Sequence, residues 1–189
     1  MTRIVWQVVH PQLTGTELLD LEQRGTDFVL RGWVVGEVDR APLAVAYEIL
    51  TDGQWTTRRV TVTVSPEGRT LAIEHDGNGR WTVDGDERPD LSECRDVDLG
   101  ISPSTNTLPI RRLGLEVGEF AHLEAAWVRF PEMTVEVLPQ TYERIGQRMY
   151  RYTSPGFQRD VEVDADGLVV RYGDDLWQAV GTLGLAARN

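Results

Sequence analysis

The sequence contains very little cysteine and no long apolar run. Its one cysteine, Cys94, excludes an internal disulfide and is typical of a reducing compartment. No apolar stretch approaches the length of a transmembrane helix. The first residues, MTRIVWQVVHPQ, also lack the apolar run of a secretory signal. We therefore expect a soluble, cytoplasmic protein without stable membrane insertion.

Positive charge is scarce as well. Lys and Arg together number 19 against 30 for Asp and Glu, which gives a formal net charge of −11. Nucleic-acid binding gains most of its affinity from neutralised phosphates, so we expect no nucleic-acid partner. An anionic membrane surface would likewise repel the chain.

Patterns that carry metal or catalytic chemistry are missing. His10, His75 and His122 have no neighbour at a metal-binding spacing, and residues 76–79 lack the ligands of a calcium loop. These four residues, DGNG, are typical of a tight turn. Acidic residues on both sides of Cys94 oppose a reactive thiolate, and no Gly-x-Ser-x-Gly elbow occurs. The sequence predicts no metal, no cofactor and no established catalytic residue.

What the sequence does contain is a recurrent alternation of apolar and polar residues. At 189 residues, without linker or repeat, it is expected to form a single domain over residues 1–189. Phe28–Val38, Leu43–Ile49 and Trp55–Val64 alternate with period two, and Asp52-Gly53 is interpreted as a two-residue hairpin turn. Further strands are predicted at Leu71–His75, Arg112–Val117, Ala121–Phe130, Met133–Leu138, Phe157–Val163 and Leu168–Tyr172.

This spacing predicts a mainly β fold. Short strands rich in Val, Thr, Trp and Tyr indicate a curved antiparallel sheet that forms a partly open, barrel-like domain with little helix. Two segments are ambiguous. Glu17–Leu21 fits a helical turn or an edge strand. Pro139–Tyr152 fits either a helix or a strand, and Gly146 and its tyrosines favour the strand.

A cluster of acidic residues needs charge compensation. Asp96 and Asp98 are two residues apart, so both face the same side of a strand, with Val97 on the other. Arg111 and Arg112 are the candidate partners by proximity in sequence. The group fits a structural carboxylate–arginine network better than a catalytic pair, and both interpretations stay open at this point.

One long stretch resembles a known family. Residues 76–115 contain a distinctive series: Asp76-Gly77, Gly79, Trp81, Cys94, Asp96-Val97-Asp98 and NTLPIRR from Asn106 to Arg112. It continues through AWVRFP from Ala126, then Gln140, Tyr142 and Tyr150-Arg151-Tyr152, and upstream through Trp6, Glu17, Gly32, Tyr47 and Trp55. In these residues the chain resembles the putative glycolipid-binding family of bacteria, formerly a domain of unknown function. Ser104, where the family tends to carry an aromatic residue, and the short Ser154–Gly156 segment depart from the pattern.

The resemblance implies a function and a set of site residues. The family's fold is similar to that of bacterial lipoprotein carriers, which implies a non-catalytic binding or carrier protein for a lipid or glycolipid-like small molecule. Aromatic residues would contact the ligand and arginines would meet a charged head. The candidate ligand-binding residues are Trp81, Asp96, Asp98, Asn106, Arg111, Arg112, Trp127, Arg129 and Tyr152. The alternatives are an enzyme that uses Asp96 or Asp98 with an arginine on a lipid-like or sugar-like substrate, and a partner-binding structural module.

Overall fold

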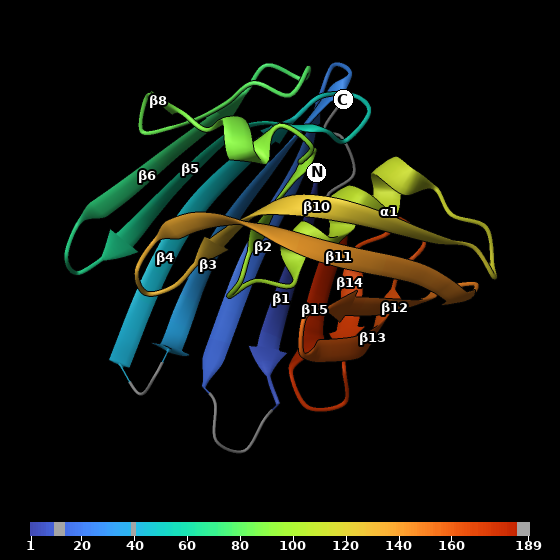
Figure 1. Cartoon of the computed structure of the whole chain (residues 1–189). Coiled ribbons are helices and arrows are strands. Elements are labelled where there is room, and N and C mark those ends of the chain that lie inside the picture. Colours follow the sequence, from blue (N-terminus) through green and yellow to red (C-terminus); the bar gives the residue numbers. More distant parts are fainter. Residues whose placement is uncertain (10–13, 39–40, 185–189) are drawn as a thin grey trace.

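The structure is dominated by one curved sheet (Figure 1). The computed structural model describes residues 1–9, 14–38 and 41–184. Its strands are β1 (Thr2–Val8), β2 (Gly15–Arg24), β3 (Asp27–Val38), β4 (Ala41–Thr51), β5 (Thr57–Ser65), β6 (Arg69–His75), β7 (Trp81–Val83), β8 (Asp86–Glu87), β9 (Asp96–Leu99), β10 (Phe120–Arg129), β11 (Thr134–Gly146), β12 (Met149–Ser154), β13 (Phe157–Val163), β14 (Val169–Tyr172) and β15 (Trp177–Gly184). The helical segments are η1 (Pro89–Leu91), η2 (Ser104–Asn106) and α1 (Thr107–Leu113).

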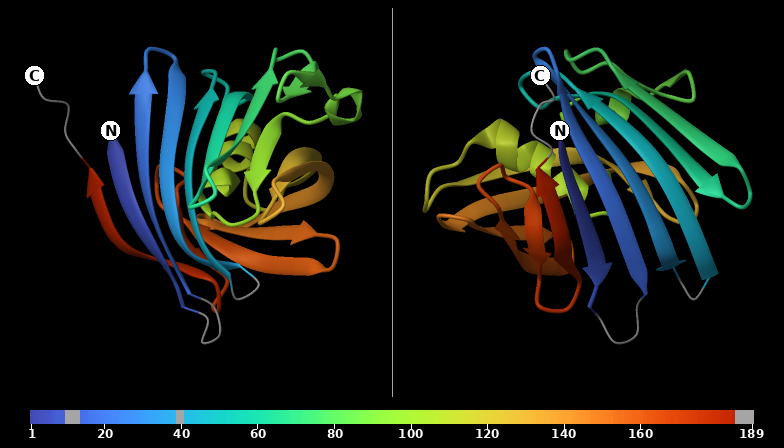
Figure 2. Two further views of the ribbon diagram at one scale, coloured as in Figure 1. Left: turned by 90° about the vertical axis from the view of Figure 1, so that its left-hand side faces the viewer. Right: turned by 180° about the vertical axis from the view of Figure 1, so that it is seen from behind.

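The sheet coils so that its two ends approach each other without closing. Its strand order is β8-β7-β6-β5-β4-β3-β2-β1-β15-β14-β13-β12-β11-β10-β9, and only β9 and β10 run parallel. Strands β10 and β11 cross in front of β2–β4, and the helical segment lies inside the curve (Figures 1 and 2). Strand β9, at one end of the strand order, contacts the start of β5. The amide of Thr57, the first residue of β5, donates to the Arg95 carbonyl at 3.0 Å, and Thr57 Oγ1 accepts from the Val97 amide at 3.0 Å. The predicted mainly β, curved and partly open fold is confirmed.

Strand alternation places the apolar residues on the concave face. In one row across the sheet Trp6 lies opposite Glu17, which lies opposite Val34. Apart from Glu17, the inward residues of β1–β6 are mainly apolar and belong to one large core cluster. Burial of this face provides most of the free energy that holds the curved sheet together.

A second, smaller core lies under α1 and strands β11–β14. It contains Tyr142, Tyr150, Tyr152 and Val161. Strand β9 lies between the two cores, because Val97 and Leu99 pack in the large cluster while Asp96 and Asp98 bond to residues outside it. The prediction that Asp96 and Asp98 face one side, with Val97 on the other, is confirmed.

The predicted strand Arg112–Val117 is wrong. Residues up to Leu113 form helix α1, which ends at Gly114 in the left-handed conformation with φ 56°. Such a glycine commonly ends a helix because it has no Cβ to clash. Leu108 packs in the large core and Ile110 in the small one, so this segment fills the space between the two cores. Period-two alternation over a few residues did not distinguish this arrangement from a strand.

Other local predictions are now decided. Residues 17–21 lie within β2, a central strand rather than an edge, and residues 139–152 form parts of β11 and β12. Asp52-Gly53 is not a two-residue hairpin, because β4 ends at Thr51 and β5 begins at Thr57. The loop from Asp76 is a tight turn as expected, with Asp76 Oδ1 accepting from the amides of Asn78 and Arg80 at 2.6 and 3.1 Å.

Two features are absent from the described residues. Within them, no helix has the length and apolar character needed to cross a membrane. The same residues contain no group of three or more His, Cys, Asp and Glu side chains arranged to hold a metal ion. His10 lies outside the described residues.

Candidate functional site

Asp96 and Arg112 form a buried ion pair. Arg112 donates from Nε to Oδ1 at 3.1 Å and from Nη2 to Oδ2 at 2.6 Å. The Asp96 side chain is 1% exposed and that of Arg112 is 20% exposed. Burial raises the pKa of Asp96, and the hydrogen bonds from Arg112 oppose that rise. A bidentate arginine satisfies both carboxylate oxygens, so Asp96 has a structural partner.

Asp98 is held by neutral groups instead. Gln140 Nε2 donates to its Oδ2 at 2.5 Å, and the Thr105 hydroxyl approaches its Oδ1 at 3.5 Å. Burial raises the pKa of Asp98 to about 6, against the opposing effect of these two hydrogen bonds, and Asp96 adds a small repulsion. We refer to Asp96, Asp98, Arg112, Gln140 and Thr105 as the Asp96 group.

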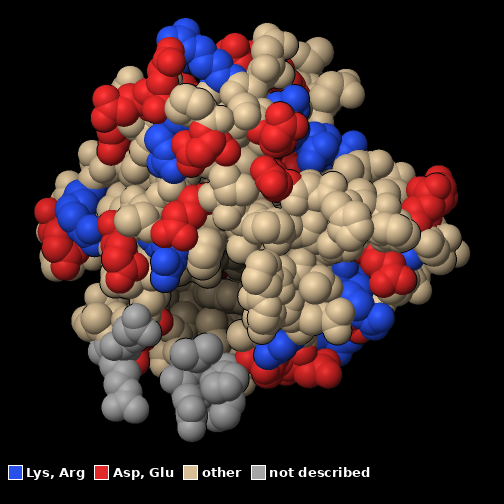
Figure 3. Space-filling view, viewed as in Figure 1, with Lys and Arg blue, Asp and Glu red and all other residues tan. Residues whose placement is uncertain are grey.

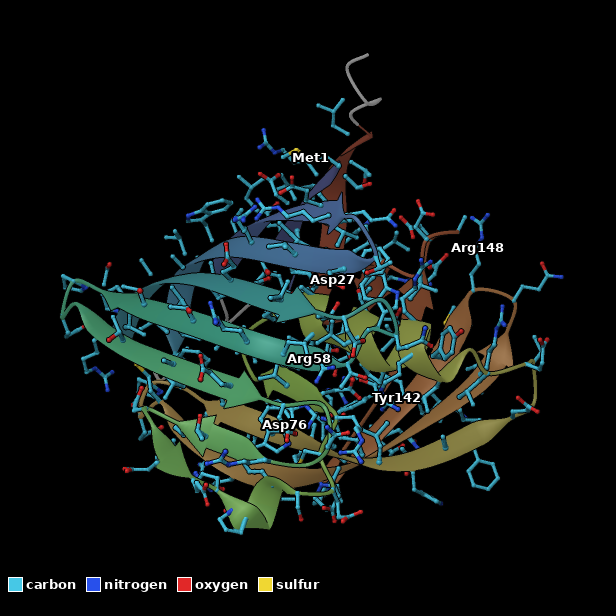
Figure 4. All side chains as sticks on the ribbon, turned by 90° about the horizontal axis from the view of Figure 1, so that it is seen from above. Met1, Asp27, Arg58, Asp76, Tyr142 and Arg148 are labelled. Atoms are coloured by element: carbon cyan, nitrogen blue, oxygen red, sulfur yellow. The ribbon has the colours of Figure 1, made fainter. Side chains whose placement is uncertain are left out.

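Asn106 and Tyr152 lie beside this group. Asn106 Oδ1 accepts from the Tyr142 hydroxyl at 2.8 Å, and the rings of Tyr142 and Tyr152 meet edge to face at 5.2 Å. Tyr142 lies inside the molecule, whereas Arg148 lies at its periphery (Figure 4). Asp96, Asp98, Asn106, Arg112 and Tyr152, predicted from the sequence, are therefore brought to one region.

The other predicted site residues lie elsewhere. Trp81 is buried in the large core, where it stacks on His75 at 4.2 Å. Arg111 donates to the Asp166 carbonyl at 2.9 Å and lies 4.9 Å from the Trp55 ring. Arg129 bonds to Glu136 at 3.2 Å and lies 5.1 Å from the ring of Trp127. These arginines do not converge with Arg112 on one anion-binding position.

The structure shows a second buried polar cluster that the candidate residues did not include. The carboxyl of Glu17, on β2, is fully buried in the large core. Its Oε1 accepts from the hydroxyl of Tyr47 on β4 in a very short contact, and from the Ser102 hydroxyl at 2.7 Å. Ser104 lies 2.5 Å from the Tyr47 hydroxyl and 2.7 Å from that of Ser102. We call these four residues the Glu17 group.

The backbone creates the space that the Glu17 group occupies. Gly32 on β3 lies directly opposite Tyr47, and a Cβ at Gly32 would come within 2.0 Å of the tyrosine ring. The absence of a side chain at Gly32 thus lets the Tyr47 ring lie flat across β3 toward Glu17 on β2. Ser102 and Ser104 come from the segment after β9, which folds inward against the concave face.

None of the described arginines compensates the Glu17 group. Burial raises the pKa of Glu17 to about 8, and hydrogen bonds from Tyr47 and Ser102 only partly oppose this rise. Burial also raises the pKa of Tyr47 well above its usual value, so its hydroxyl remains neutral. Oε2 of Glu17 has no hydrogen-bond partner among the described residues. The carboxyl is therefore mostly neutral at pH 7, with an unpaired oxygen inside an apolar core.

A sequence signal for this group existed. Glu17 occupies the same face of β2 as Leu19 and Leu21, so it is a charged residue in the apolar phase of a strand. Glu17, Gly32 and Tyr47 also belong to the family pattern described above. Their proximity could not be derived from the sequence, because the pairing of β2, β3 and β4 decides it.

The concave face is hollowed beside the Glu17 group. The next row of inward positions contains Gly15 and Gly36, which lie opposite each other. Val8, Leu43 and Trp177 surround these glycines and are only partly buried. The space-filling view shows a hollow with mainly uncharged walls at this end of the concave face (Figure 3). The Glu17 group itself is buried and so lies behind the wall of this hollow. An apolar hollow with polar groups close by can bind a molecule with an apolar and a polar part.

A different depression lies on the second half of the sheet. It has a volume of about 660 Å³ and lies over β10, β11 and β12. Its lining includes Gln140, Thr141, Thr153, Glu93 and Glu124. The Asp96 group reaches this depression through Gln140, which also bonds Asp98.

Comparison with known proteins identifies the family. The family model described as putative glycolipid-binding matches residues 3–179. The chain belongs to this family. A crystal structure of a DUF1089 family protein from Pseudomonas aeruginosa is similar, with a TM-score of 0.79, 30% sequence identity, and coverage of 88% of this chain and 92% of that one. None of the curated proteins matches the chain.

Proposed function

We propose that the protein binds an amphiphilic molecule, a lipid or glycolipid, in the hollow of its concave face and does not transform it. The observation that carries this proposal is the buried Glu17 group near the hollow, at the end of the sheet where Val8, Leu43 and Trp177 are only partly buried. Apolar walls suit the chain of an amphiphile, and a few polar groups fix its head. The family description supports the same class of ligand.

The contacts of the Asp96 group support a structural role over the enzymatic alternative. Both oxygens of Asp96 accept from Arg112, and Asp98 is engaged by Gln140. A catalytic carboxylate needs an oxygen that can reach the substrate. Asp96 and Arg112 satisfy each other, so this pair stabilises the junction of β9 and α1.

A partner-binding function has one supporting observation on the outer face of the sheet. Trp33 is 44% exposed and Val35 is 63% exposed. In the strand register Trp33 lies between Leu18 and Ala46, so apolar residues are continuous across β2, β3 and β4 on that face. Analytical ultracentrifugation of the protein and its Trp33→Ser variant tests this candidate. If the protein self-associates through this surface, the substitution should lower the measured mass of the assembly.

Ligand binding is tested first by native mass spectrometry of gently purified protein. We expect added mass from a copurifying amphiphile, which organic extraction removes. Leu43→Asp, which places a charge at the hollow, should abolish that mass. Ala44→Asp, on the outer face of the same strand, is the matched control and should retain it. Equal retention of the amphiphile by both variants would contradict binding in the hollow.

A further inference from the structure

The carboxyl of Glu17 has an incomplete set of partners. Oε1 accepts from both Tyr47 and Ser102, whereas the buried Oε2 has no partner within the described part of the chain. Nearly all buried polar atoms of native proteins have a partner, because leaving one unpaired is costly. The unpaired Oε2 therefore points to a partner from outside the described part of the chain.

Two glycines lie next to Glu17 on the side of the hollow. The inward position before it on β2 is Gly15, and the inward position after Val34 on β3 is Gly36. Neighbours lie close to both glycines: a Cβ at Gly15 would come within 3.0 Å of Val8 and 3.2 Å of Trp177, and a Cβ at Gly36 within 2.5 Å of the Thr14 carbonyl oxygen. The hollow of Figure 3 lies at this end of the sheet. A ligand head that enters the hollow therefore reaches the Glu17 group by displacing the side chains of Val8 and Trp177, which are only partly buried.

The surroundings of Glu17 select against a charged ligand head. Only burial and the hydrogen bonds from Tyr47 and Ser102 set its pKa, so no arginine acts on it. A phosphate or carboxylate would bring negative charge to an acidic group without compensation. An ammonium head would have to lose its water and ionise a buried carboxyl at the same time, which is costly even when the two charges pair.

We propose that the Glu17 group binds the uncharged, hydroxyl-bearing head of the amphiphile, as in a sugar or glycerol head. A hydroxyl both donates and accepts, so it can pair with Oε2 in either protonation state of the carboxyl. The hydroxyls of Tyr47, Ser102 and Ser104 add further donors and acceptors. This inference rests on the proposed function, because it assigns the polar end of the ligand whose apolar part lies in the hollow.

The test compares three amphiphiles that share an octyl chain: octyl glucoside, octyl phosphate and octyltrimethylammonium. Titration calorimetry below their micellar concentrations should show tightest binding of the glucoside, with the two charged heads about tenfold weaker or more. Tighter or equal binding of either charged head overturns the assignment. This comparison uses the wild-type protein, so it does not depend on the folding of any variant.

Substitutions at Glu17 then test whether the polar head of the ligand binds there. Glu17→Met removes both carboxyl oxygens at similar volume and should weaken glucoside binding about tenfold, whereas Glu17→Gln keeps a polar group and should restore most of it. Glu37→Met, on the outer face of β3, is the matched control and should bind as the wild type does. Unchanged glucoside binding by a folded Glu17→Met protein contradicts the proposal. If Glu17→Met does not fold, Tyr47→Phe is the second variant, with a weaker effect of the same sign.

The outcomes separate this inference from the proposed function. If all three amphiphiles bind the wild type equally and Leu43→Asp abolishes binding, the hollow binds amphiphiles but the Glu17 group does not select the head. If none of the three binds, both proposals fail.

Discussion

Asp96 and Glu17 are both buried carboxyl groups, yet their environments differ in the charge that surrounds them. Asp96 receives two hydrogen bonds from Arg112, while Glu17 receives two from neutral hydroxyls and keeps one unpaired oxygen. All 19 cationic residues of the chain are arginines, and none of the described ones pairs with Glu17. A guanidinium with fixed bidentate geometry stabilises a buried carboxylate, as at Asp96.

The contrast separates stability from binding. In a compensated pair such as Asp96–Arg112 both carboxylate oxygens already accept a hydrogen bond, and the pair contributes to the packing of α1 on β9. An uncompensated group such as Glu17 lowers stability unless another molecule completes it. Groups that lower stability and have no structural role are expected at functional sites.

Arg112→Ala should be strongly destabilising. It leaves the Asp96 carboxylate, which is 1% exposed, without its partner. Breaking a buried pair in this way costs about 3 to 5 kcal/mol in the free energy of unfolding. Urea denaturation measures the change. Arg151→Ala, which breaks the exposed pair with Asp160, is the control and should change stability by less than about 1 kcal/mol. Equal, small effects of both variants would show that the Asp96 group is not structural.

Glu17→Gln should change how stability depends on pH. The pKa of Glu17 is raised from 4.5 to about 8 on folding, so between these values the folded state binds more protons than the unfolded state. Stability therefore falls as pH rises through this window and levels off above the folded pKa. From pH 6 to 8 the Glu17 contribution is a loss of about 2 to 3 kcal/mol, which Glu17→Gln should remove.

The pH effect is measured as the difference between variant and wild type. Urea denaturation at several pH values for wild type, Glu17→Gln and the exposed control Glu37→Gln isolates the contribution of Glu17. Other groups titrate equally in all three proteins. A wild type and a Glu17→Gln variant with parallel pH profiles would contradict the buried, neutral state of this carboxyl.

Gly32→Ala should disturb the Glu17 group through packing alone. The added Cβ would lie 2.0 to 2.3 Å from atoms of the Tyr47 ring, so the ring must move away from Glu17. Overpacking of this kind costs about 2 kcal/mol. Gly181→Ala is the matched control, because a Cβ there meets nothing within 4 Å. A Gly32→Ala protein as stable as the control would show that Tyr47 is not held over β3.

Asp98→Ala should have the smallest effect of the four. It removes the acceptor of the Gln140 and Thr105 hydrogen bonds but leaves no buried charge behind. We expect a loss of about 1 to 2 kcal/mol by urea denaturation. The loss should be smaller than that of Arg112→Ala, and the reverse order would mean that Asp98 rather than Asp96 anchors the group.

Local sequence features predicted the fold class well, and one segment shows their limit. Strand alternation and turn residues indicated a curved β sheet, and the strands at Phe28–Val38 and Phe157–Val163 are where they were expected. Arg112–Val117 was wrong because a short segment that fills the space between two cores is under no constraint to repeat with period two. Arg111 and Arg112 were both candidate partners of the acidic pair by proximity in sequence. Arg112 pairs with Asp96, whereas Arg111 bonds to the Asp166 carbonyl instead.

Alternation along the sequence indicates which face of a strand each side chain takes: Glu17 lies in the apolar phase of β2, and Asp96 lies opposite Val97 on β9. Whether each carboxyl meets a cation depends on the tertiary structure. Asp96 is 16 positions from Arg112, and one short helix brings them together. Glu17 meets Tyr47 and Ser102 across 30 and 85 positions, through strand pairing and the inward fold of the segment after β9. Sequence patterns encode which face a side chain takes, but contacts between distant segments depend on register and sheet curvature, which the whole chain sets together.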